Sequence, residues 1–233
     1  MEGSGELTLL GIMVGPWTRA FENWAVMARR YGWRHRILGR ETTRYVPHLT
    51  KVQCLLEHCT GLPRSELVCY LDGTDGFVCD SPERVLTAYR SYGHPLVFGA
   101  ERGPYPEHEF SVPDPVWRWA NAGAFVGEAG IVADGLSEGH ALGDWENHGF
   151  VCDQHAFNLF FHHPKGQGLA TVDHRREIVA NVAAGPDTIG DFARHRQKVT
   201  RGRPEGCSSI LHFFGGNRSG YNRFARLYGL LEI

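Results

Sequence analysis

Short apolar runs alternate along the chain with stretches in which apolar residues recur at helical spacing. Residues 6–14 form a largely apolar run that Gly15 closes. Residues 17–31 then place Phe21 and Trp24 at the spacing of one helical face. An apolar run bounded by turn residues predicts a buried strand, whereas the second spacing predicts a helix. The chain is therefore predicted to open with a strand, a turn and a helix.

The same alternation continues to the end of the chain. Predicted strands follow at residues 36–38, 67–71, 95–100, 121–127, 169–173, 177–182 and 207–212. Predicted helices cover residues 47–59, 81–92, 129–140 and 153–161, and a last amphipathic helix ends at residue 231. Strands that alternate with helices are typical of α/β domains built on a parallel sheet.

Two segments lack either period. Residues 101–119 contain too many prolines for a helix or a strand, and long loops in compact domains are commonly functional. Residues 186–206 are polar, basic and interrupted by glycine and proline, which predicts a mobile segment or one that faces a second substrate. A solvated charged face is the commoner explanation for such basic residues.

Composition narrows the class of protein. At 233 residues, with 42% hydrophobic content, we expect one globular domain that spans residues 1–233. A net charge of −2 favours a small-molecule partner over nucleic acid or an anionic membrane. No signal peptide or transmembrane segment is predicted, and six cysteines without C-x-x-C spacing indicate reduced thiols, as in the cytoplasm. High arginine and glycine usage with little lysine indicates a bacterial genome.

The most informative stretch is residues 67–78, where an apolar run ends in two carboxylates, Asp72 and Asp75. Ligands of open α/β sheets bind outside the carboxyl ends of the strands. Gly73 and Gly76 permit a tight turn, so both carboxylates could converge on one hard divalent cation. The alternative is a polar turn in which the aspartates bond to their own backbone, and the strand alone leaves both interpretations open.

A second chemical signal lies at residues 212–218, where His212 at a predicted strand end precedes a glycine loop and a cation. Imidazole is an acceptable ligand for a Mn²⁺ ion that also takes carboxylates. Gly215 and Gly216 would let backbone amides approach a phosphate, and Arg218 could neutralise its charge. Alone, His212 is more typical of a buried core histidine than of a metal ligand. Paired with the acidic turn, it becomes a candidate third metal ligand.

These motifs resemble those of the GT-A glycosyltransferases. Residues 70–75 resemble their D-x-D or D-x-x-D metal signature. Residues 212–218 resemble the H-F-x-G-x-x-K motif of the glycogenin-like retaining enzymes, with Arg218 in place of lysine. The order of motifs is most similar to the glycosyltransferase domain of the collagen lysyl hydroxylases. Further matches to that domain lie at residues 98–101, 123–127, 153–157 and 172–178.

The resemblance implies a single GT-A (Rossmann-like) α/β domain with a mixed, mostly parallel central sheet flanked by helices. It also implies a metal-dependent glycosyltransferase that moves a hexose from a nucleotide sugar, a UDP-sugar, to a hydroxyl of a small-molecule, glycan or protein acceptor. The glycogenin-like motif favours retention of anomeric configuration. Mn²⁺ or Mg²⁺ would be the cofactor, stabilising the charge of the departing diphosphate.

The resemblance also assigns roles to individual residues. Asp72, Asp75 and His212 would hold the metal. Residues implied to contact the donor are Met13, Val14, Lys51, Thr74, Gly215, Gly216 and Arg218. Asn121 and Asp153 fall near the transferred sugar and are the catalytic candidates. Asp153 would orient the sugar or steady positive charge, and the competing interpretation is a simple helix N-cap.

Two other functions use the same residues. A metal-dependent phosphohydrolase could employ the carboxylates to activate water, although hydrolases usually assemble more ligands for a two-metal site. A non-catalytic sugar-nucleotide-binding module is the second, but it would not need Asp153 in addition to the metal ligands. The terminal H-F-F-G-G-N motif departs from the lysyl hydroxylase form, so the resemblance does not imply a collagen acceptor.

Overall fold

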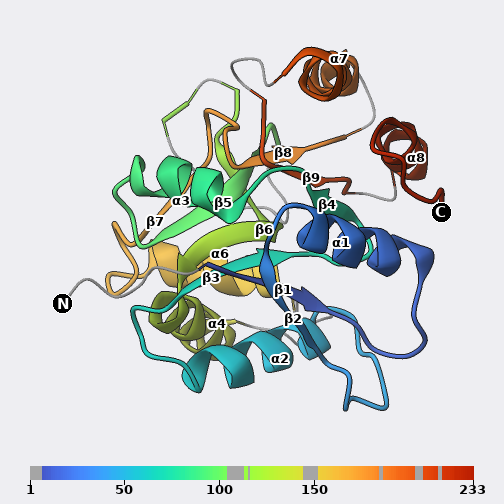
Figure 1. Cartoon of the computed structure of the whole chain (residues 1–233). Coiled ribbons are helices and arrows are strands. Elements are labelled where there is room, and N and C mark those ends of the chain that lie inside the picture. The colour runs from blue at the N-terminus through green and yellow to red at the C-terminus, as the bar shows by residue number, and fades with distance from the viewer. Residues whose placement is uncertain are drawn as a thin grey trace.

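A six-stranded sheet runs through the middle of the protein, with helices on both of its faces (Figure 1). The computed structural model describes residues 7–103, 113–114, 116–143, 152–183, 186–202, 207–214 and 217–233. The strands lie in the order β2 (Arg34–Leu38), β1 (Thr8–Ile12), β3 (Leu67–Leu71), β6 (Trp119–Glu128), β5 (Leu96–Glu101) and β7 (Ala170–Val172).

The sheet is mixed and mostly parallel, as expected. β6 runs antiparallel to both of its neighbours, β3 and β5, whereas the other paired strands are parallel. The carboxyl ends of β3 and β5 therefore lie at the same edge as the first residues of β6. This arrangement gathers Asp72, Glu101 and Asn121 at one edge of the sheet.

Two helical layers bury the faces of this sheet. α2 (Leu49–Thr60), α4 (Ala129–Leu142) and α6 (Asp153–His162) cover one face, and α1 (Arg19–Arg30) and α3 (Pro82–Arg90) cover the other (Figure 1). The predicted strand, turn and helix at the start are confirmed. Thr18 caps α1 by accepting a hydrogen bond from the Phe21 amide at 3.2 Å.

A second, three-stranded sheet joins the two motifs found in the sequence. β4 (Gly76–Val78) pairs antiparallel with β9 (Ile210–His212), and β9 pairs parallel with β8 (Val179–Asn181). In these registers Gly76 and Asn181 both lie opposite His212. The acidic turn and the histidine, far apart in the sequence, are thus held together by backbone pairing.

The segment expected to be irregular is largely a helix, α7 (Pro186–Arg201), which packs on α8 (Arg218–Leu227) through Phe192 and Phe224. Its buried positions hold polar residues, which apolar periodicity does not reveal. Asp191 forms an ion pair with Arg176 at 2.7 Å, and both side chains are buried. No helix was predicted at residues 186–201, whereas the expectation of a mobile segment or one that faces a second substrate stays a prediction. Residues 203–206 lie outside the described part of the chain.

Three further observations concern the cysteines, the lengths of the helices and the proline-rich loop. All six cysteines are free thiols, and five of them are buried. Within the described ranges, no helix has both the length and the apolar character needed to cross a membrane. Much of the proline-rich loop, residues 104–112 and 115, lies outside the described residues.

A buried carboxylate fixes the turn between β7 and β8. Asp173 Oδ1 accepts hydrogen bonds from the Tyr92 hydroxyl at 2.6 Å and the Glu177 amide at 3.0 Å. Its Oδ2 accepts from the amides of Ile178 at 2.8 Å and Val179 at 2.7 Å. The Asp173 side chain is fully buried, so water could not take its place as the acceptor for these four donors. Asp173 thereby sets the path by which β8 enters the second sheet.

We expect Asp173→Asn to lower the free energy of unfolding by about 1.5 to 3 kcal/mol, measured by urea denaturation. The substitution replaces one carboxylate oxygen, which accepts hydrogen bonds, with an NH₂ group, which cannot accept them, so buried N–H donors lose their partner. Asp134→Asn is the control, since this carboxylate pairs with exposed Arg64 at the surface and its loss should change stability little. Equal urea midpoints for Asp173→Asn and the wild type would show that the carboxylate does not hold the turn.

Candidate active site

Two adjoining cavities open where β3 and β5 end. The larger has a volume of about 790 Å³, and the smaller about 450 Å³. The larger is lined by seven of the residues singled out from the sequence: Lys51, Asp72, Thr74, Asp75, Asn121, Asp153 and His212. Arg218 lines the smaller cavity, and Thr74 and Asp75 line both. The acidic turn therefore stands at the boundary between the two.

Four predicted donor contacts are not placed in these cavities. Met13 is buried in the core, and neither Met13 nor Val14 lines either cavity. The predicted contacts Gly215 and Gly216 lie outside the described residues.

Lys51 is the central cation of the larger cavity. Its Nζ lies 2.7 Å from Asp153 Oδ2 and 3.3 Å from Asp72 Oδ1, and it donates to the Ala122 carbonyl at 2.9 Å. Burial alone would lower the pKa of Lys51, but the two carboxylates outweigh burial and raise it well above its usual value. Lys51 is thus a charged ammonium with fixed partners, and its contacts join α2, β3, β6 and α6.

A bulge in β6 supplies one of those partners. The pairing of β5 with β6 shifts register after Phe98, so residues 122–124 have no partner in β5, although Ala124 pairs with Leu71 of β3. The Ala122 amide donates to Gln154 Oε1 at 3.0 Å, and its carbonyl accepts from Lys51. Bulges beside active sites often redirect side chains, and here cavity-lining side chains satisfy the displaced peptide groups.

Both the oxygen and the nitrogen of the Asn121 side-chain amide form hydrogen bonds. Its Oδ1 accepts from the Gly123 amide at 2.8 Å, and its Nδ2 donates to Glu101. Burial raises the pKa of Glu101, although the hydrogen bond from Asn121 opposes this. Sequence analysis assigned no role to Glu101. The available signal was an acid that directly follows an apolar run, the same signal that identified Asp72.

The predicted metal ligands lie close enough to change one another's pKa values. Asp72 Oδ2 lies 3.7 Å from His212 Nε2, and Asp72 Oδ1 accepts from the Tyr70 hydroxyl. Burial would raise the pKa of Asp72, but the charge of Lys51 and the His212 side chain outweigh it and lower that pKa. Burial, followed by the Asp72 charge, raises the pKa of Asp75. A cation between the two carboxylates would relieve their repulsion.

Geometry also brings together a different trio. Within the described residues, one set of three metal-ligating side chains has all its ligand atoms within 4.8 Å, namely His48, Cys152 and Asp153. Burial, and then Asp153, raise the pKa of Cys152 to about 11, which disfavours the thiolate that a metal needs. The ammonium of Lys51 also contacts Asp153 and would repel a cation. This trio is a poor metal site.

The set Asp72, Asp75 and His212 fits a divalent cation better, although it is not a closed trio in this structure. Neighbouring ligands in an octahedron of Mg²⁺ size are about 3 Å apart, close to the 3.7 Å between His212 and Asp72. Such ions commonly take one or two carboxylates and complete their shell with water and phosphate oxygens.

Asp153 is the first residue of α6, and the cap position belongs to Cys152, which makes no side-chain cap bond. The interpretation of Asp153 as a simple N-cap is therefore wrong. Burial would raise the pKa of Asp153, but Lys51 and His48 outweigh it and lower that pKa. The carboxylate belongs to the cavity and not to its own helix.

His48 reaches Asp153 from a strained backbone. Its Nδ1 lies 2.9 Å from Asp153 Oδ1, and its φ and ψ are 60° and −49°. The Leu49 amide donates to the Pro47 carbonyl at 2.7 Å, which closes a γ-turn of the rare positive-φ kind. Strain of this type persists where the surroundings enforce it and is often functional. Sequence analysis missed His48 because no local pattern marks it.

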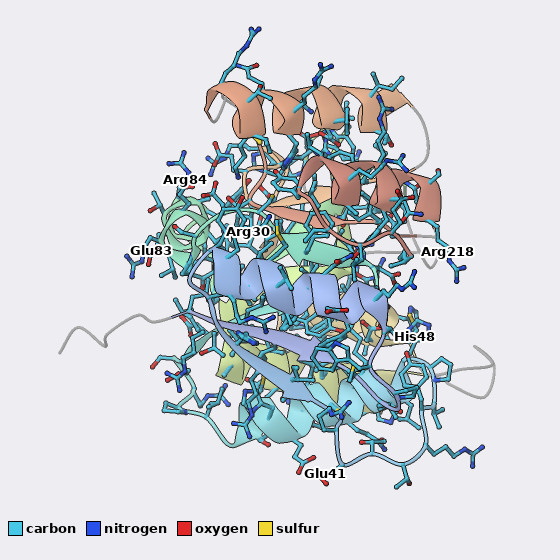
Figure 2. All side chains as sticks on the ribbon, turned by 45° about the vertical axis from the view of Figure 1, so that its right-hand side comes forward. Arg30, Glu41, His48, Glu83, Arg84 and Arg218 are labelled. Atoms are coloured by element: carbon cyan, nitrogen blue, oxygen red, sulfur yellow. The ribbon has the colours of Figure 1, made fainter. Side chains whose placement is uncertain are left out.

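Two helices begin at the smaller cavity, and each begins with an arginine. Arg19 begins α1, Arg218 begins α8, and both line the cavity. Asn217 caps α8 by accepting from the Gly220 amide at 3.0 Å. Helix N-termini and arginines both favour anions. Figure 2 shows Arg218 on the same side of the molecule as His48, which lines the larger cavity.

Comparison with solved structures identifies the fold. A glycosyltransferase involved in the glycosylation of the major capsid of PBCV-1 superposes with a TM-score of 0.57 at 12% identity, over 96% of this chain and 99% of that one. The glycosyltransferase GlyE of Streptococcus pneumoniae TIGR4 gives 0.49 at 14% identity, over 91% and 55%. A 2-C-methyl-D-erythritol 4-phosphate cytidylyltransferase of Francisella tularensis gives 0.41 at 10%, over 72% and 88%.

No protein-family model matches the sequence, and no curated protein matches it either. The first structural match shows that this chain has a GT-A-like α/β fold. The closer resemblance to lysyl hydroxylases and glycogenin stays a prediction.

We expect Lys51→Met to lower the free energy of unfolding by about 3 to 5 kcal/mol near neutral pH, because it leaves the buried Asp153 and the half-buried Asp72 without their cation. In the wild type the pKa values of Asp72 and Asp153 lie below their usual range, so this contribution is present above pH 3.8 and is lost at lower pH. The deficit of the variant should therefore shrink as the pH falls and its carboxyl groups become protonated. Urea denaturation at several pH values measures this.

Lys165→Met is the matched control, because the ion pair of Lys165 with Glu138 is exposed and should contribute little. Adding Asp153→Asn to Lys51→Met should recover part of the lost stability. A deficit that does not change with pH would contradict the assignment of Lys51 as the counterion of these acids.

Proposed function

We propose that the protein is a metal-dependent glycosyltransferase that moves a hexose from a UDP-sugar to a hydroxyl of a small-molecule, glycan or protein acceptor. The observation that carries the proposal is the position of Thr74 and Asp75 at the boundary of two cavities. One cavity has cationic helix ends, suited to a nucleoside diphosphate. The other has fixed polar groups, suited to a sugar. The GT-A-like fold supports this assignment.

Asp72, Asp75 and His212 would hold Mn²⁺ or Mg²⁺ at this boundary. A bound divalent cation acts as a Lewis acid that stabilises the negative charge of the departing diphosphate. Arg218 would bind the same diphosphate from the smaller cavity, where its planar guanidinium offers two parallel donors instead of the single ammonium of a lysine. Backbone amides of Gly215 and Gly216 are proposed to complete this contact.

The nucleoside would lie toward the end of β1. Thr74 borders both cavities, which suits a contact with the ribose. Val14 is half-buried and would border the base, whereas Met13 is only 4% exposed and would support the base from beneath.

The sugar would occupy the larger cavity beside Lys51, Asp153 and Asn121. Asp153 is ionised by its ion pairs, so it would orient sugar hydroxyls or steady the positive charge that develops as the glycosidic bond breaks. Asn121 would contribute its amide edge beside Glu101. We propose transfer with retention of configuration, on the resemblance to the glycogenin-like motif.

Thermal-shift screening of UDP-sugars with and without Mn²⁺ tests the proposal. A ligand at one hundred times its dissociation constant stabilises the native state by about 2.7 kcal/mol, so we expect a clear Mn²⁺-dependent rise in Tm. Asp72→Asn should remove the Mn²⁺-dependent part, whereas the surface variant Asp134→Asn should retain it. A wild type that shows no such rise with any nucleotide sugar would refute the proposal.

The reaction products separate the alternative functions. Release of phosphate without a sugar-linked product would favour a phosphohydrolase. Tight binding without turnover of any acceptor would favour a binding module. Proton NMR of the glycosylated product would show whether the anomeric configuration is retained.

We expect Asp153→Asn to reduce turnover by about 100-fold or more while donor binding persists, because the charge that faces the sugar is lost. Transfer assays at saturating UDP-sugar, compared with Asp72→Asn, measure this. Full activity of Asp153→Asn alongside an inactive Asp72→Asn would eliminate a catalytic role for Asp153.

A further inference from the structure

We infer that Asn181 is a positioning residue that fixes the tautomer of His212, so that its Nε2 lone pair faces Asp72. The inference deepens the proposed function, because it rests on His212 as a metal ligand. No local motif marks Asn181. It ends the three-residue strand β8 and lies opposite His212 in the parallel pairing with β9.

A chain of three hydrogen-bonding groups determines which nitrogen carries the proton. Asn181 Nδ2 donates to the Ala100 carbonyl at 3.0 Å, and a carbonyl can only accept. The amide oxygen of Asn181 therefore faces the other way, 2.7 Å from His212 Nδ1. Because that oxygen also only accepts, Nδ1 must be the protonated nitrogen of the imidazole.

This tautomer leaves a lone pair on Nε2. Nε2 lies 3.7 Å from Asp72 Oδ2, so in the Nδ1–H tautomer the Nε2 lone pair and the carboxylate would face each other with one electron pair each. Two such groups repel unless a proton or a cation lies between them. Metal-bound histidines are commonly held in this way, with the second ring nitrogen donating to an oxygen of the protein.

Glycines leave room for both side chains. A Cβ at Gly123 of β6 would lie 2.2 Å from His212 Cε1 and 2.4 Å from Nε2. A Cβ at Gly99 of β5 would lie 2.8 Å from Asn181 Nδ2. Asn181 and His212 are 1% and 3% exposed, so water does not compete for their hydrogen bonds. Asn181 and His212 are therefore both part of the second sheet, and their side chains are packed against glycines of the first.

The first experiment observes the tautomer directly, without metal. In ¹⁵N NMR spectra of histidine-labelled protein, the His212 signals are assigned by their loss in His212→Gln. We expect wild-type His212 to show a protonated Nδ1 and an unprotonated Nε2. Asn181→Leu should give a mixture of tautomers, whereas Asn181→Asp retains an acceptor for Nδ1 and should preserve the wild-type pattern.

The second experiment measures Mn²⁺ affinity in the presence of UDP, by electron paramagnetic resonance of the free ion. We expect Asn181→Leu to weaken binding by about 10- to 100-fold, with Asn181→Asp much closer to the wild type. Asn23→Leu is the matched control. Asn23 is an equally buried asparagine that bonds to Tyr221 and the Leu231 carbonyl. Its loss should affect stability but neither the tautomer nor Mn²⁺ affinity.

The two measurements separate this inference from the proposed function. A protonated Nε2 in the wild type, or unchanged Mn²⁺ affinity in a folded Asn181→Leu variant, would overturn the role of Asn181. Equal weakening of Mn²⁺ binding in Asn23→Leu and Asn181→Leu would also overturn it, since the effect would then be general destabilisation. The expected tautomer in a wild type that binds no Mn²⁺ would refute the metal-dependent function and support the positioning by Asn181.

Discussion

The geometry of this site depends on one buried ammonium group, that of Lys51. Its three contacts reach the end of β3, the bulge of β6 and the first turn of α6. A buried charge is tolerated only when it is paired and hydrogen-bonded, so these three elements are constrained to meet at one point. Asp72 and Asp153, which would otherwise repel each other, both contact this cation. The cavity is shaped as much by this electrostatic constraint as by the apolar core around it.

Much of the fold is predictable because apolar runs and helical spacing report burial directly. The reversed direction of β6 is not, since an isolated strand has the same pattern in either orientation. α7 was missed for a different reason. Its inward positions include Asp191 and His195, whose polarity is balanced by Arg176 and the Tyr228 hydroxyl. Only the folded chain brings these partners together, so a search for apolar periodicity finds no helix there.

The residues of the candidate site also fall into those that the sequence identifies and those that it does not. Asp72 and His212 are found from the sequence because each stands at the end of an apolar run. Glu101 carries the same signal, yet its significance is clear only when β6 brings Asn121 beside it. Asn181 and His48 carry no local signal, because their importance lies in partners distant in the chain. Residue type thus predicts the side chains that would contact a ligand. The side chains that orient them are identified only once the topology of the fold is known.

The bulge of β6 has a consequence for how this protein could diverge. Side chains alternate between the two faces of a strand, so deleting one residue from the bulge would turn Asn121 and the residues before it to the opposite face. Because Lys51 and Gln154 bond to the backbone of Ala122, substitutions at Ala122 can preserve these contacts while length changes cannot. Descendants of this chain would be free to change the chemistry of their cavity, but their alignments should show no gaps at residues 122–124.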